Sequence, residues 1–399
     1  MSDTQIEYRR IEGRSTPFYQ MLLVLTVMAV AGVVATWILW SEGLHLSGMT
    51  NRIPWGVQIT MAVFYIGLSA GSLVVSGLYG VFGRIEYKPF ARLAAYIAML
   101  FLIAGLLSIL TDQGRMDRVF VEPFTHFNVR SMFSINPGLY MGHIVLCVVY
   151  LWALFREKKL LTRVAAVVVV LWAITVHTGT GMILGFIPRE LHQSPLLPPS
   201  FVAAALASGT ALMIIVLVTL FRLTRRHLDD ALIVWLGRLL AISLVVVFYF
   251  MFIESAYRYY LIESREAARF YLFGGFHSVL LWGGLMIVGC LIPSVILFHP
   301  RLGRTIPWIV FAAAMVVFGV LCERYVIVIP GQTNPPELFP GMVITTSPLD
   351  EGFVSYSISS YEALQAVGVL GIVGLLFVLG LKYLALAPVE ARLPRGAGS

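Results

Sequence analysis

Four polar residues that follow the third hydrophobic run of the chain have types and spacing suited to proton chemistry. The run Leu93–Leu110 leads into Asp112, and Arg115 follows three residues later. His126 and Asn128 lie a short distance further on. A carboxylate at the end of a membrane helix is costly, so it normally has a partner or a function. Arg115 is the nearest possible partner at helical spacing, and a functional acid is the alternative to an ion pair.

Other ionisable residues fall at a similar depth in other hydrophobic runs. They are His177, Glu254, Tyr257, Arg258, Glu323, Arg324 and Glu362, with Arg189, Glu190 and His192 in a nearby loop. His143 lies near the middle of its run. Ionisable groups inside a membrane are rare and often mark binding sites or pathways. The pattern predicts one shared polar pocket near one face of the membrane, with a purely structural ion-pair network as the alternative.

A lipid-soluble quinone suits such a pocket. Its tail partitions into the bilayer, and its head group carries two oxygens that need hydrogen-bond partners. Oxidation or reduction of the head group moves protons, so nearby carboxylates and imidazoles can serve as acid and base. We expect Asp112 and His177 to contact the head group, with Glu254 taking part in the proton chemistry. Three arginines are expected to keep the acids ionised: Arg115, Arg258 and Arg324.

The composition is that of an integral membrane protein. Of 399 residues, 59% are hydrophobic and 12% are charged, and the apolar runs are long and continuous. Such runs predict helices, because a helix satisfies its own backbone polar groups in lipid. Cys147, Cys290 and Cys322 lie inside apolar runs without CxxC spacing, which argues against an iron–sulfur cluster in this chain. No metal site is predicted.

Ten runs are long enough to cross the membrane, which takes about 20 residues for each helix. We expect an all-α membrane domain over residues 18–385, between an N-terminal tail (1–17) and a C-terminal tail (386–399). The first run is interpreted as an uncleaved helix rather than a signal peptide. The predicted spans are Phe18–Trp40, Trp55–Val81, Leu93–Leu110, Phe133–Phe155, Val164–Phe186, Phe201–Phe221, Ala231–Phe252, Leu272–Phe298, Ile306–Ile327 and Ala363–Leu384.

The basic residues predict the orientation. Most of the 28 lysines and arginines fall in the tails and in the loops on the same side as the tails. Because cytoplasmic loops are enriched in Lys and Arg, both termini are expected in the cytoplasm. The loop Pro330–Ser357 carries no basic residue, as expected for the outer side. The net charge of +7 is explained in this way without a nucleic-acid partner.

Several short motifs resemble the NrfD/polysulfide-reductase membrane-subunit family. They are Pro54-Trp55-Gly56 at the start of a span, the small-residue helix that follows, Asp112-x-Gly-Arg115 and the His126/Asn128 pair. The ten-span form is most similar to the membrane subunit of hydrogenase-2 and to the DsrP subunit of the DsrMKJOP sulfur-metabolism complex. The stretch Glu323-Arg324 to Pro330-Gly331, with Glu362 opening the last span, looks like the DsrP branch in particular.

The resemblance implies a fold and a set of site residues. Family members have two four-helix bundles related by inversion, here expected over 55–186 and 201–327, flanked by the first helix (18–40) and the last (363–384). They bind menaquinone or ubiquinone near the periplasmic face and carry no haem or iron–sulfur cluster of their own. When the family's site is carried over to this sequence, the resemblance implies these quinone-binding residues: Asp112, Arg115, His126, Asn128, His177 and Arg324. The proton route is expected to use His143, Glu254, Arg258 and Glu362.

The resemblance also implies partners and a location. This chain is expected to be a non-haem, quinone-reactive subunit in the bacterial inner membrane, in contact with membrane lipid. Electrons would pass to or from a periplasmic ferredoxin-like subunit of the DsrO type. Further expected partners are a multihaem cytochrome c of the DsrJ type and subunits like DsrM and DsrK.

Two other functions fit parts of the sequence. A b-type cytochrome would use His143 and His177 as axial haem ligands, although no repeated His spacing on a helix pair supports it. A secondary transporter built on inverted repeats would need paired Gly- or Pro-broken helices at the midplane, whereas the polar layer is off-centre. The quinone interpretation is favoured over both.

Overall fold

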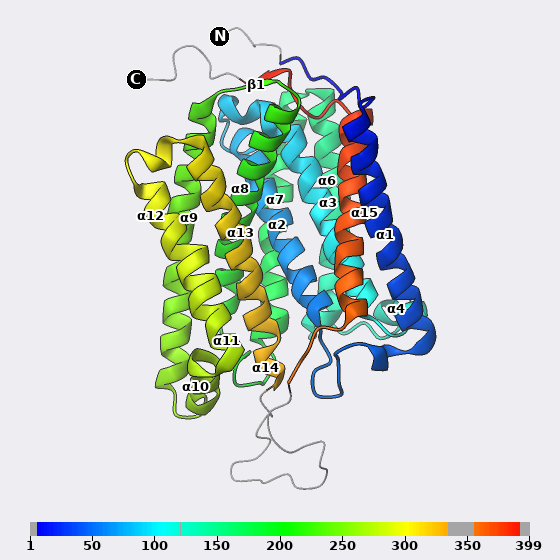
Figure 1. Ribbon diagram of the computed structural model, residues 1–399, viewed down its shortest axis with the longest axis vertical. Coiled ribbons are helices and arrows are strands. Elements are labelled where there is room, and N and C mark those ends of the chain that lie inside the picture. The colour runs from blue at the N-terminus through cyan, green and yellow to red at the C-terminus, as the bar shows by residue number, and fades with distance from the viewer. Residues whose placement is uncertain (1–5, 120, 334–354, 392–399) are drawn as a thin grey trace.

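Among the residues that the computed structural model describes, ten helices are long and apolar enough to cross a membrane (Figure 1). The structure describes residues 6–119, 121–333 and 355–391. The prediction of an all-helical membrane protein with ten spans is confirmed. The spans are α1 (Thr16–Glu42), α2 (Val57–Gly80), α3 (Lys88–Asp112), α6 (Met132–Arg156), α7 (Lys159–Gly185), α8 (Leu197–Leu223), α9 (Asp230–Tyr260), the composite helix α11 (Gly275–Val279), η3 (Leu280–Leu291) and α12 (Ile292–Phe298), then α13 (Ile306–Val328) and α15 (Ser360–Tyr383).

Short elements connect these spans. Most of the predicted outer loop Pro330–Ser357 and parts of both predicted tails lie outside the described residues. The connecting elements are η1 (Leu44–Leu46), η2 (Ile85–Tyr87), α4 (Met116–Val119), α5 (Glu122–Thr125), β1 (His227–Leu228), α10 (Arg265–Phe273), η4 (Leu302–Arg304), α14 (Pro330–Thr333) and β2 (Glu390–Ala391).

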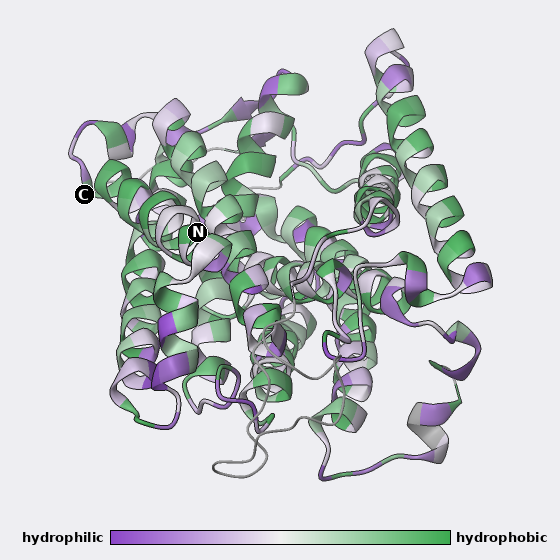
Figure 2. Ribbon diagram, turned by 60° about the horizontal axis from the view of Figure 1, so that its bottom comes forward, coloured by the Kyte–Doolittle hydropathy of each residue, from purple (hydrophilic) through white to green (hydrophobic). Residues whose placement is uncertain are grey.

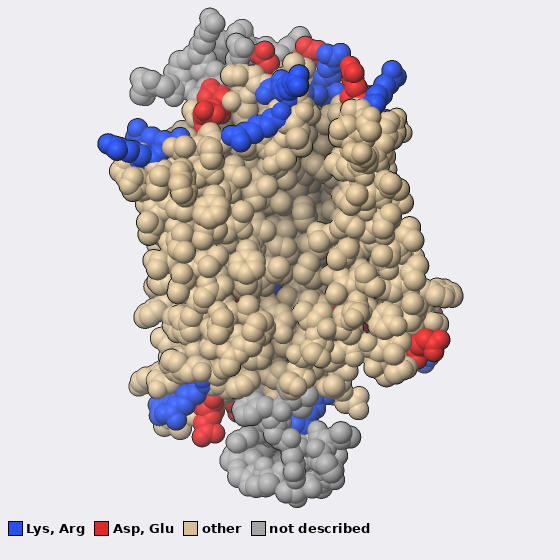
Figure 3. All heavy atoms as spheres, viewed as in Figure 1, with Lys and Arg blue, Asp and Glu red and all other residues tan. Residues whose placement is uncertain are grey.

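The distribution of polarity is that of a membrane-spanning protein. Figure 2 shows helices that are largely hydrophobic, with hydrophilic residues concentrated toward helix ends and loops. On the face in Figure 3, charged side chains gather at the two ends and leave an almost uncharged band between them. Many large apolar side chains point outward, among them Leu23, Val145 and Ile242. In water such a surface would be unfavourable, whereas in lipid it is the expected exterior.

Both described terminal segments lie at the same end of the molecule, here called the terminal end (Figure 1). Tyr8 pairs with Pro388, and β1 runs parallel to β2. The guanidinium of Arg226 donates to carbonyl oxygens of both segments, at Ala387 (2.9 Å) and Arg9 (2.9 Å), among others. The opposite end is called the distal end. Placement of the terminal end in the cytoplasm stays a prediction.

Helix α2 lies at the centre of the packing and is almost completely buried. It contacts α3, α7, α8 and α13. The helices α2, α3, α6 and α7 contact one another, as do α8, α9, the α11–α12 span and α13. Helix α1 packs mainly on α15, which in turn contacts α3 and α2. An inverted relation between the two groups of four stays a prediction.

The close crossing of α2 and α8 depends on two glycines. A Cβ atom on Gly71 would overlap the carbonyl oxygen of Ala205, and one on Gly209 would overlap the backbone of Gly71. Small residues allow helices to approach closely in lipid, where van der Waals packing drives association. The small-residue pattern of this span therefore serves packing, as its sequence indicates.

Replacing Gly209 by leucine is expected to destabilise the protein by about 1–3 kcal/mol or more, because the added side chain forces α2 and α8 apart. The measurement is the thermal unfolding midpoint in detergent. Gly138→Leu is the matched control, since a Cβ on this helical glycine meets nothing within 4 Å. Equal midpoints for both variants would contradict the crossing as described.

Two helices extend further than their hydrophobic runs. Helix α3 begins at Lys88 and ends at Asp112, so this carboxylate belongs to the last helical turn. Helix α9 continues to Tyr260, well past the predicted end at Phe252. Its last turns carry Glu254 and Arg258 at i,i+4 spacing, where they form an ion pair. Hydropathy alone ended this span too early because paired charges are compatible with a continuing helix.

The eighth span contains wide helical turns over Leu280–Leu291, directly before Pro293. Proline lacks the backbone N–H and its ring clashes with the carbonyl group of the preceding turn. Wider i→i+5 turns accommodate that clash. The helix therefore accommodates Pro293 with a π-helical segment rather than a break.

Candidate functional site

Asp112 is a buried carboxylate at the distal end of α3. Its side chain is only 6% exposed, and its Oδ1 atom has no hydrogen-bond partner among the described residues. The backbone of Gly56 and the carboxylate of Glu362 lie within interaction range of the Asp112 carboxylate. An unpaired carboxylate oxygen in a low-dielectric setting is costly unless water or a ligand satisfies it. Asp112 is thus suited to accept a hydrogen bond from a bound molecule.

The predicted ion pair between Asp112 and Arg115 does not form. Arg115 instead makes a bidentate pair with Asp117, at 2.9 Å from Nε to Oδ1 and 2.8 Å from Nη2 to Oδ2. Both partners are exposed, and this pairing lowers the pKa of Asp117. The prediction fails because α3 ends at Asp112 and Gln113 is extended, so helical spacing no longer applies.

Glu362 organises the loops beside Asp112. Its Oε2 accepts hydrogen bonds from the backbone N–H groups of Gly48 (2.9 Å) and Ser359 (2.9 Å), and its Oε1 accepts one from the Tyr356 hydroxyl (2.7 Å). With Ser359 it forms the capping box that starts α15. Burial, together with the hydrogen bond to Glu362, raises the pKa of Tyr356. Glu362 is therefore a fully bonded anchor in this structure.

Gly56 lies directly against this carboxylate. A Cβ atom at Gly56 would overlap Oε1 of Glu362 and lie 2.9 Å from the Tyr356 hydroxyl oxygen. The Tyr356 hydroxyl is also 2.7 Å from the backbone nitrogen of Val57, at the start of α2. The Pro54-Trp55-Gly56 motif thus needs glycine at its third position because the Glu362 carboxylate lies there.

An aromatic group surrounds Trp55, the residue before Gly56. The Trp55 ring lies 5.7 Å from the ring of Phe133 and 6.4 Å from that of His192, measured between centroids. Gln332 fixes the Trp55 backbone: its Oε1 accepts from the Trp55 N–H (3.0 Å), and its Nε2 donates to the Trp55 carbonyl (3.1 Å). Trp55 directly precedes Gly56, whose backbone lies beside the Asp112 carboxylate.

His192 is fully buried in the loop between α7 and α8. Its Nε2 lies 3.0 Å from the carbonyl oxygen of Ile327. Burial, and secondarily the positive charge of Arg258, lowers the pKa of His192 from the usual 6.5 to about 4. The imidazole is therefore neutral at pH 7, with Nε2–H donating to Ile327.

This lowered pKa predicts a pH dependence of stability. As the pH falls from about 6.5 to about 4, the unfolded chain protonates His192 and the folded chain does not, so the free energy of unfolding decreases. The loss amounts to about 3 kcal/mol over the window. His192→Gln removes the titrating group but keeps a donor for Ile327. Its unfolding midpoint should fall less steeply with decreasing pH than that of the wild type; parallel curves would contradict the assignment.

His177 lies deeper in the membrane domain than Asp112. Its Nε2 is 3.9 Å from the position of a Cβ on Gly67, whereas Asp112 lies beside Gly56. These two glycines are eleven residues apart along the chain, which corresponds to about 16 Å along α2. Arg324 and His143 are the charged or titratable groups that interact with His177. The structure does not bring Asp112 and His177 into contact with one small head group.

The side chains of Glu323 and Arg324 form a completely buried ion pair. Its closest charged atoms are 3.8 Å apart, and the Arg324 guanidinium lies 4.0 Å from the centre of the Phe201 ring. None of the three guanidinium nitrogens and neither carboxylate oxygen has a hydrogen-bond partner among the described residues. Buried charges are normally hydrogen-bonded as well as paired. This pair is therefore a second place where water or a ligand atom is needed.

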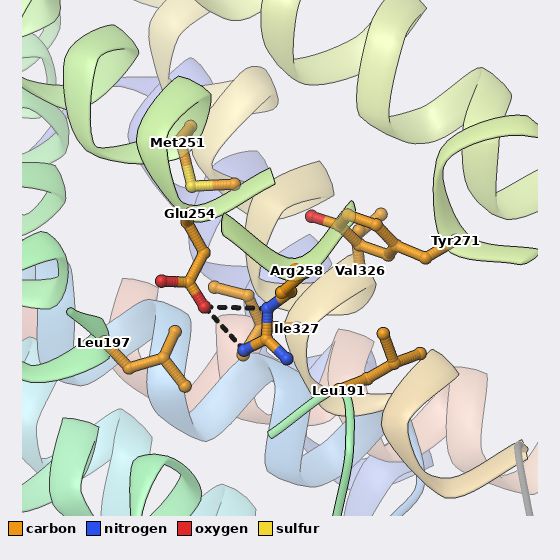
Figure 4. Close-up of a pocket in the computed structure, with 8 residues that line it drawn as sticks. All are labelled: Leu191, Leu197, Met251, Glu254, Arg258, Tyr271, Val326 and Ile327. Carbon is orange, nitrogen blue, oxygen red and sulfur yellow. Dashed lines mark hydrogen bonds and ion pairs between the residues drawn. The ribbon is translucent and has the colours of Figure 1, made fainter. Parts of the chain in front are cut away.

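Glu254 and Arg258 form a well-bonded ion pair near the distal end of α9 (Figure 4). The Nε of Arg258 donates to Oε1 of Glu254 (2.7 Å), and Ser194 donates to its Oε2 (2.7 Å). Arg258 also donates to the carbonyl oxygen of Glu190 (2.6 Å). A cavity of about 20 Å³ beside the pair, lined also by Tyr271, has room for one water molecule. The two residues together form a structural tie between α9 and the α7–α8 loop.

His126 and Asn128 lie in the exposed loop after α5. His126 pairs through Nδ1 with the Thr125 hydroxyl (2.9 Å), and Oδ1 of Asn128 accepts from the backbone N–H of Arg130 (2.9 Å). Neither residue is part of the buried groups around Asp112 or Arg324. Their place in the quinone-binding set stays a prediction.

The packing of His177 gives no support to the cytochrome alternative. The Nε2 atom of His177 faces the backbone of α2 at Gly67, where the Ser208 hydroxyl is also close. Haem ligation by His143 and His177 stays an alternative raised by the sequence.

Several residues that contact Trp55, Gly56 or Val57 were not singled out from the sequence. Gln332, Tyr356 and the ring of Phe133 all come from segments distant in the chain. A polar Gln332 following the apolar end of α13 was the one local signal. The contacts of Tyr356 and Phe133 depend on which helices are neighbours, and single-sequence patterns do not reveal this.

The fold and the buried distal groups define a multi-pass membrane protein with an internal polar site. Residues 45–336 match the model of the family described as polysulphide reductase, NrfD, and the chain belongs to this family. The resemblance seen in its motifs is thereby confirmed, while membership of the DsrP branch stays a prediction.

Three relatives align over most of their length. The Hdr-like menaquinol oxidoreductase integral membrane subunit of Archaeoglobus fulgidus is 38% identical, over 97% of this chain and 98% of the relative. The integral membrane subunit of menaquinone reductase from Nitratidesulfovibrio vulgaris is 25% identical, over 91% and 90% respectively. The NrfD homolog of Haemophilus influenzae is 22% identical, over 71% of this chain and 96% of the relative.

Proposed function

We propose that this chain is the quinone- or quinol-binding membrane subunit of a respiratory electron-transfer complex, with its site beside Asp112. The observation that carries the proposal is the buried Asp112 carboxylate with an unpaired oxygen, beside the backbone of Gly56, the residue that follows Trp55. The names of the Archaeoglobus and Nitratidesulfovibrio relatives refer to menaquinol and menaquinone, which supports this class of substrate.

The residues around Asp112 suit the proton side of quinol oxidation. When a quinol becomes a quinone it releases two protons and two electrons. A carboxylate with a free oxygen accepts a proton from one head-group hydroxyl, and in the reverse direction it returns the proton. The electrons pass to or from a partner subunit. Trp55 and Phe133 offer flat apolar surfaces to the ring, and the Glu362 hydrogen bonds hold the loops that border it.

The other predicted residues take separate roles in this proposal. His177, Arg324 and His143 form a deeper polar group, and we assign them to proton movement below the head group. Glu254 and Arg258 hold the α7–α8 loop, while Glu362 anchors the loop before α15. Arg115, His126 and Asn128 lie on the distal surface, where a partner subunit would dock.

We further propose a place in dissimilatory sulfur metabolism, in a complex of the DsrMKJOP type. Support comes from the Glu323–Gly331 stretch with Glu362, which looks like the DsrP branch, and from the basic residues that predict cytoplasmic termini. In this arrangement the Asp112 site is near the periplasmic face. The partners are then a ferredoxin-like DsrO-type subunit, a DsrJ-type cytochrome, and DsrM- and DsrK-like subunits.

Tryptophan fluorescence tests this proposal. Titration of the purified protein with a quinol analogue should quench its emission in a saturable manner. Trp55→Phe should remove most of the quenching amplitude, whereas Trp308→Phe, at the terminal end of α13, should leave it intact. Absence of saturable quenching in the wild type would overturn the proposal. Substrate uptake into liposomes would then test the transporter alternative.

A further inference from the structure

A single peptide group connects Gln332 with Asp112. It consists of the Trp55 carbonyl and the N–H of Gly56, the N-cap residue of α2. On one side, Nε2 of Gln332 donates to the Trp55 carbonyl oxygen (3.1 Å). On the other side, a hydrogen bond from the Gly56 backbone reaches the Asp112 carboxylate. Because a peptide group is planar, the side chain of Gln332 in α14 fixes the direction of the N–H that serves Asp112 in α3.

Gln332 itself is bound in one orientation. Its side chain is only 3% exposed, and its Oε1 accepts a hydrogen bond from the Trp55 N–H (3.0 Å). Its Nε2 also donates to the carbonyl oxygen of Val328 (2.8 Å), the last residue of α13. The amide oxygen and both amide hydrogens are thus used, which defines how the amide is turned. The end of α13 therefore orients the Trp55–Gly56 peptide.

The next residue of α2 is fixed as well. The Val57 N–H donates to the Tyr356 hydroxyl (2.7 Å), and this hydroxyl donates to Oε1 of Glu362 (2.7 Å). The peptide that carries the Gly56 N–H is thus held by side-chain hydrogen bonds before and after it. It cannot turn away from Asp112 unless one of these bonds breaks.

The hydrogen bond from Gly56 acts on the charge of Asp112. A donor to a carboxylate favours its ionised form. A second donor on the carbonyl oxygen of the same peptide polarises that peptide and strengthens the bond that its N–H makes. The partial positive charge at the start of α2 acts in the same direction. Gln332 therefore influences the Asp112 carboxylate through the Trp55–Gly56 peptide, without direct contact.

We propose that Gln332 is a positioning residue for Asp112: it orients and polarises the Trp55–Gly56 peptide, which holds the carboxylate ionised and in place. Because Gln332 follows α13 and Asp112 ends α3, this link joins the two groups of four helices at the candidate site. The link to Asp112 needs no ligand, whereas its consequence for quinol oxidation rests on the proposed function.

Infrared difference spectroscopy of the purified full chain during a pH titration tests the proposal. The carboxyl band of Asp112 is identified by its loss in Asp112→Asn. Gln332→Met keeps the size of the side chain but removes its hydrogen bonds, so the band of protonated Asp112 should appear at a pH about 0.5–1 unit higher than in the wild type.

Thr333→Val is the matched control. It removes a buried hydroxyl that donates to the Pro330 carbonyl oxygen (3.0 Å) in the same short helix, and it leaves the bonds to Trp55 in place. Its Asp112 band should titrate as in the wild type. Among the described residues, Glu362 of α15 is the charged side chain that acts on Asp112, and both variants retain it.

An unshifted band in Gln332→Met would overturn the proposal, as would equal shifts in Gln332→Met and Thr333→Val. The unfolding midpoint shows whether Gln332→Met is folded. If it is not, Gln332→Asn takes its place: its amide is one methylene shorter and loses the paired bonds to Trp55, so its band should shift in the same direction, and an unshifted band would again overturn the proposal.

The rate of quinol oxidation as a function of pH separates this proposal from the proposed function. If Asp112 accepts the quinol proton, the acidic limb of the rate profile should shift with the infrared band in Gln332→Met. A shifted band with an unshifted rate profile would keep Gln332 as the positioning residue and remove Asp112 from quinol oxidation.

Discussion

Replacing Asp112 by asparagine is expected to lower the rate of quinol oxidation by the assembled complex by about 10²-fold or more. Positioned acid–base groups contribute roughly 10²–10⁴-fold to such reactions. Asparagine keeps the size and the hydrogen-bonding capacity of the side chain but does not accept a proton. The measurement is the steady-state rate with a soluble quinol, at saturating quinol and at limiting quinol. The rate should fall even at saturating quinol, because the variant loses proton transfer but keeps the space for the head group.

Asp117→Asn is the matched control. Asp117 is five residues away in the same distal region, exposed and paired with Arg115. The Asp117→Asn variant should oxidise quinol at a rate within a factor of about two of the wild-type rate. A normal rate in Asp112→Asn would remove Asp112 from the proton chemistry. An equal loss in both variants would instead point to impaired docking of the partner subunit, because Asp117 is exposed and lies outside the proposed quinol site.

Replacing Arg258 by alanine is expected to destabilise the protein by about 3–5 kcal/mol, the cost of leaving one partner of a buried ion pair alone. Arg258 is 4% exposed, and its removal leaves Glu254 without its cation and the carbonyl groups of Glu190 and His192 without their donor. The thermal midpoint in detergent should fall sharply, and the α7–α8 loop should become more open to proteolysis.

A double variant separates structure from chemistry at this pair. Glu254→Gln with Arg258→Met removes both charges, keeps approximate volume and should regain much of the lost stability, because neither charge is left unpaired. If the pair is only a structural tie, the double variant should also regain quinol oxidation. A stable double variant that does not oxidise quinol would indicate that Glu254 takes part in proton transfer. A single Arg258→Ala variant as stable as the wild type would contradict the buried pairing.

The ten spans were predictable because hydrophobic length is a strong signal in a membrane protein, where each helix must satisfy its own backbone. The helix ends were less predictable. The run ending at Phe252 gave no sign that α9 continues through a Glu254–Arg258 pair to Tyr260. Paired charges look polar in a hydropathy scan, although the pair is compatible with a buried helix.

The depth of the candidate residues was predictable only in part. Counting along each span placed Asp112 and His177 in one distal layer, whereas they adjoin α2 about 16 Å apart. Arg115 was three residues from Asp112, but the chain leaves the helix between them, and Arg115 turns to Asp117. Sequence spacing predicts neighbours only while the helix continues.

The neighbours of Asp112 could not be predicted from local patterns. Gly56 and Glu362 are separated by most of the chain, and their contact depends on α15 packing beside α2 and α3. The two hydrogen bonds between the Gln332 side chain and the Trp55 backbone also join segments that are distant in the chain. Such contacts follow from tertiary packing, so the sequence indicated the acid but not the group that surrounds it.

Photoaffinity labelling with an azido-quinone, followed by mapping of the labelled peptides, tests the location of the site most directly. The site proposed beside Asp112 predicts that the label attaches to the peptide around Trp55 or to the peptide around Phe133. It also predicts that excess unlabelled quinol prevents the labelling. Label found instead around His177 and Arg324, with the Trp55 and Phe133 peptides unmodified, would place the head group at the deeper polar group and contradict the assignment to Asp112.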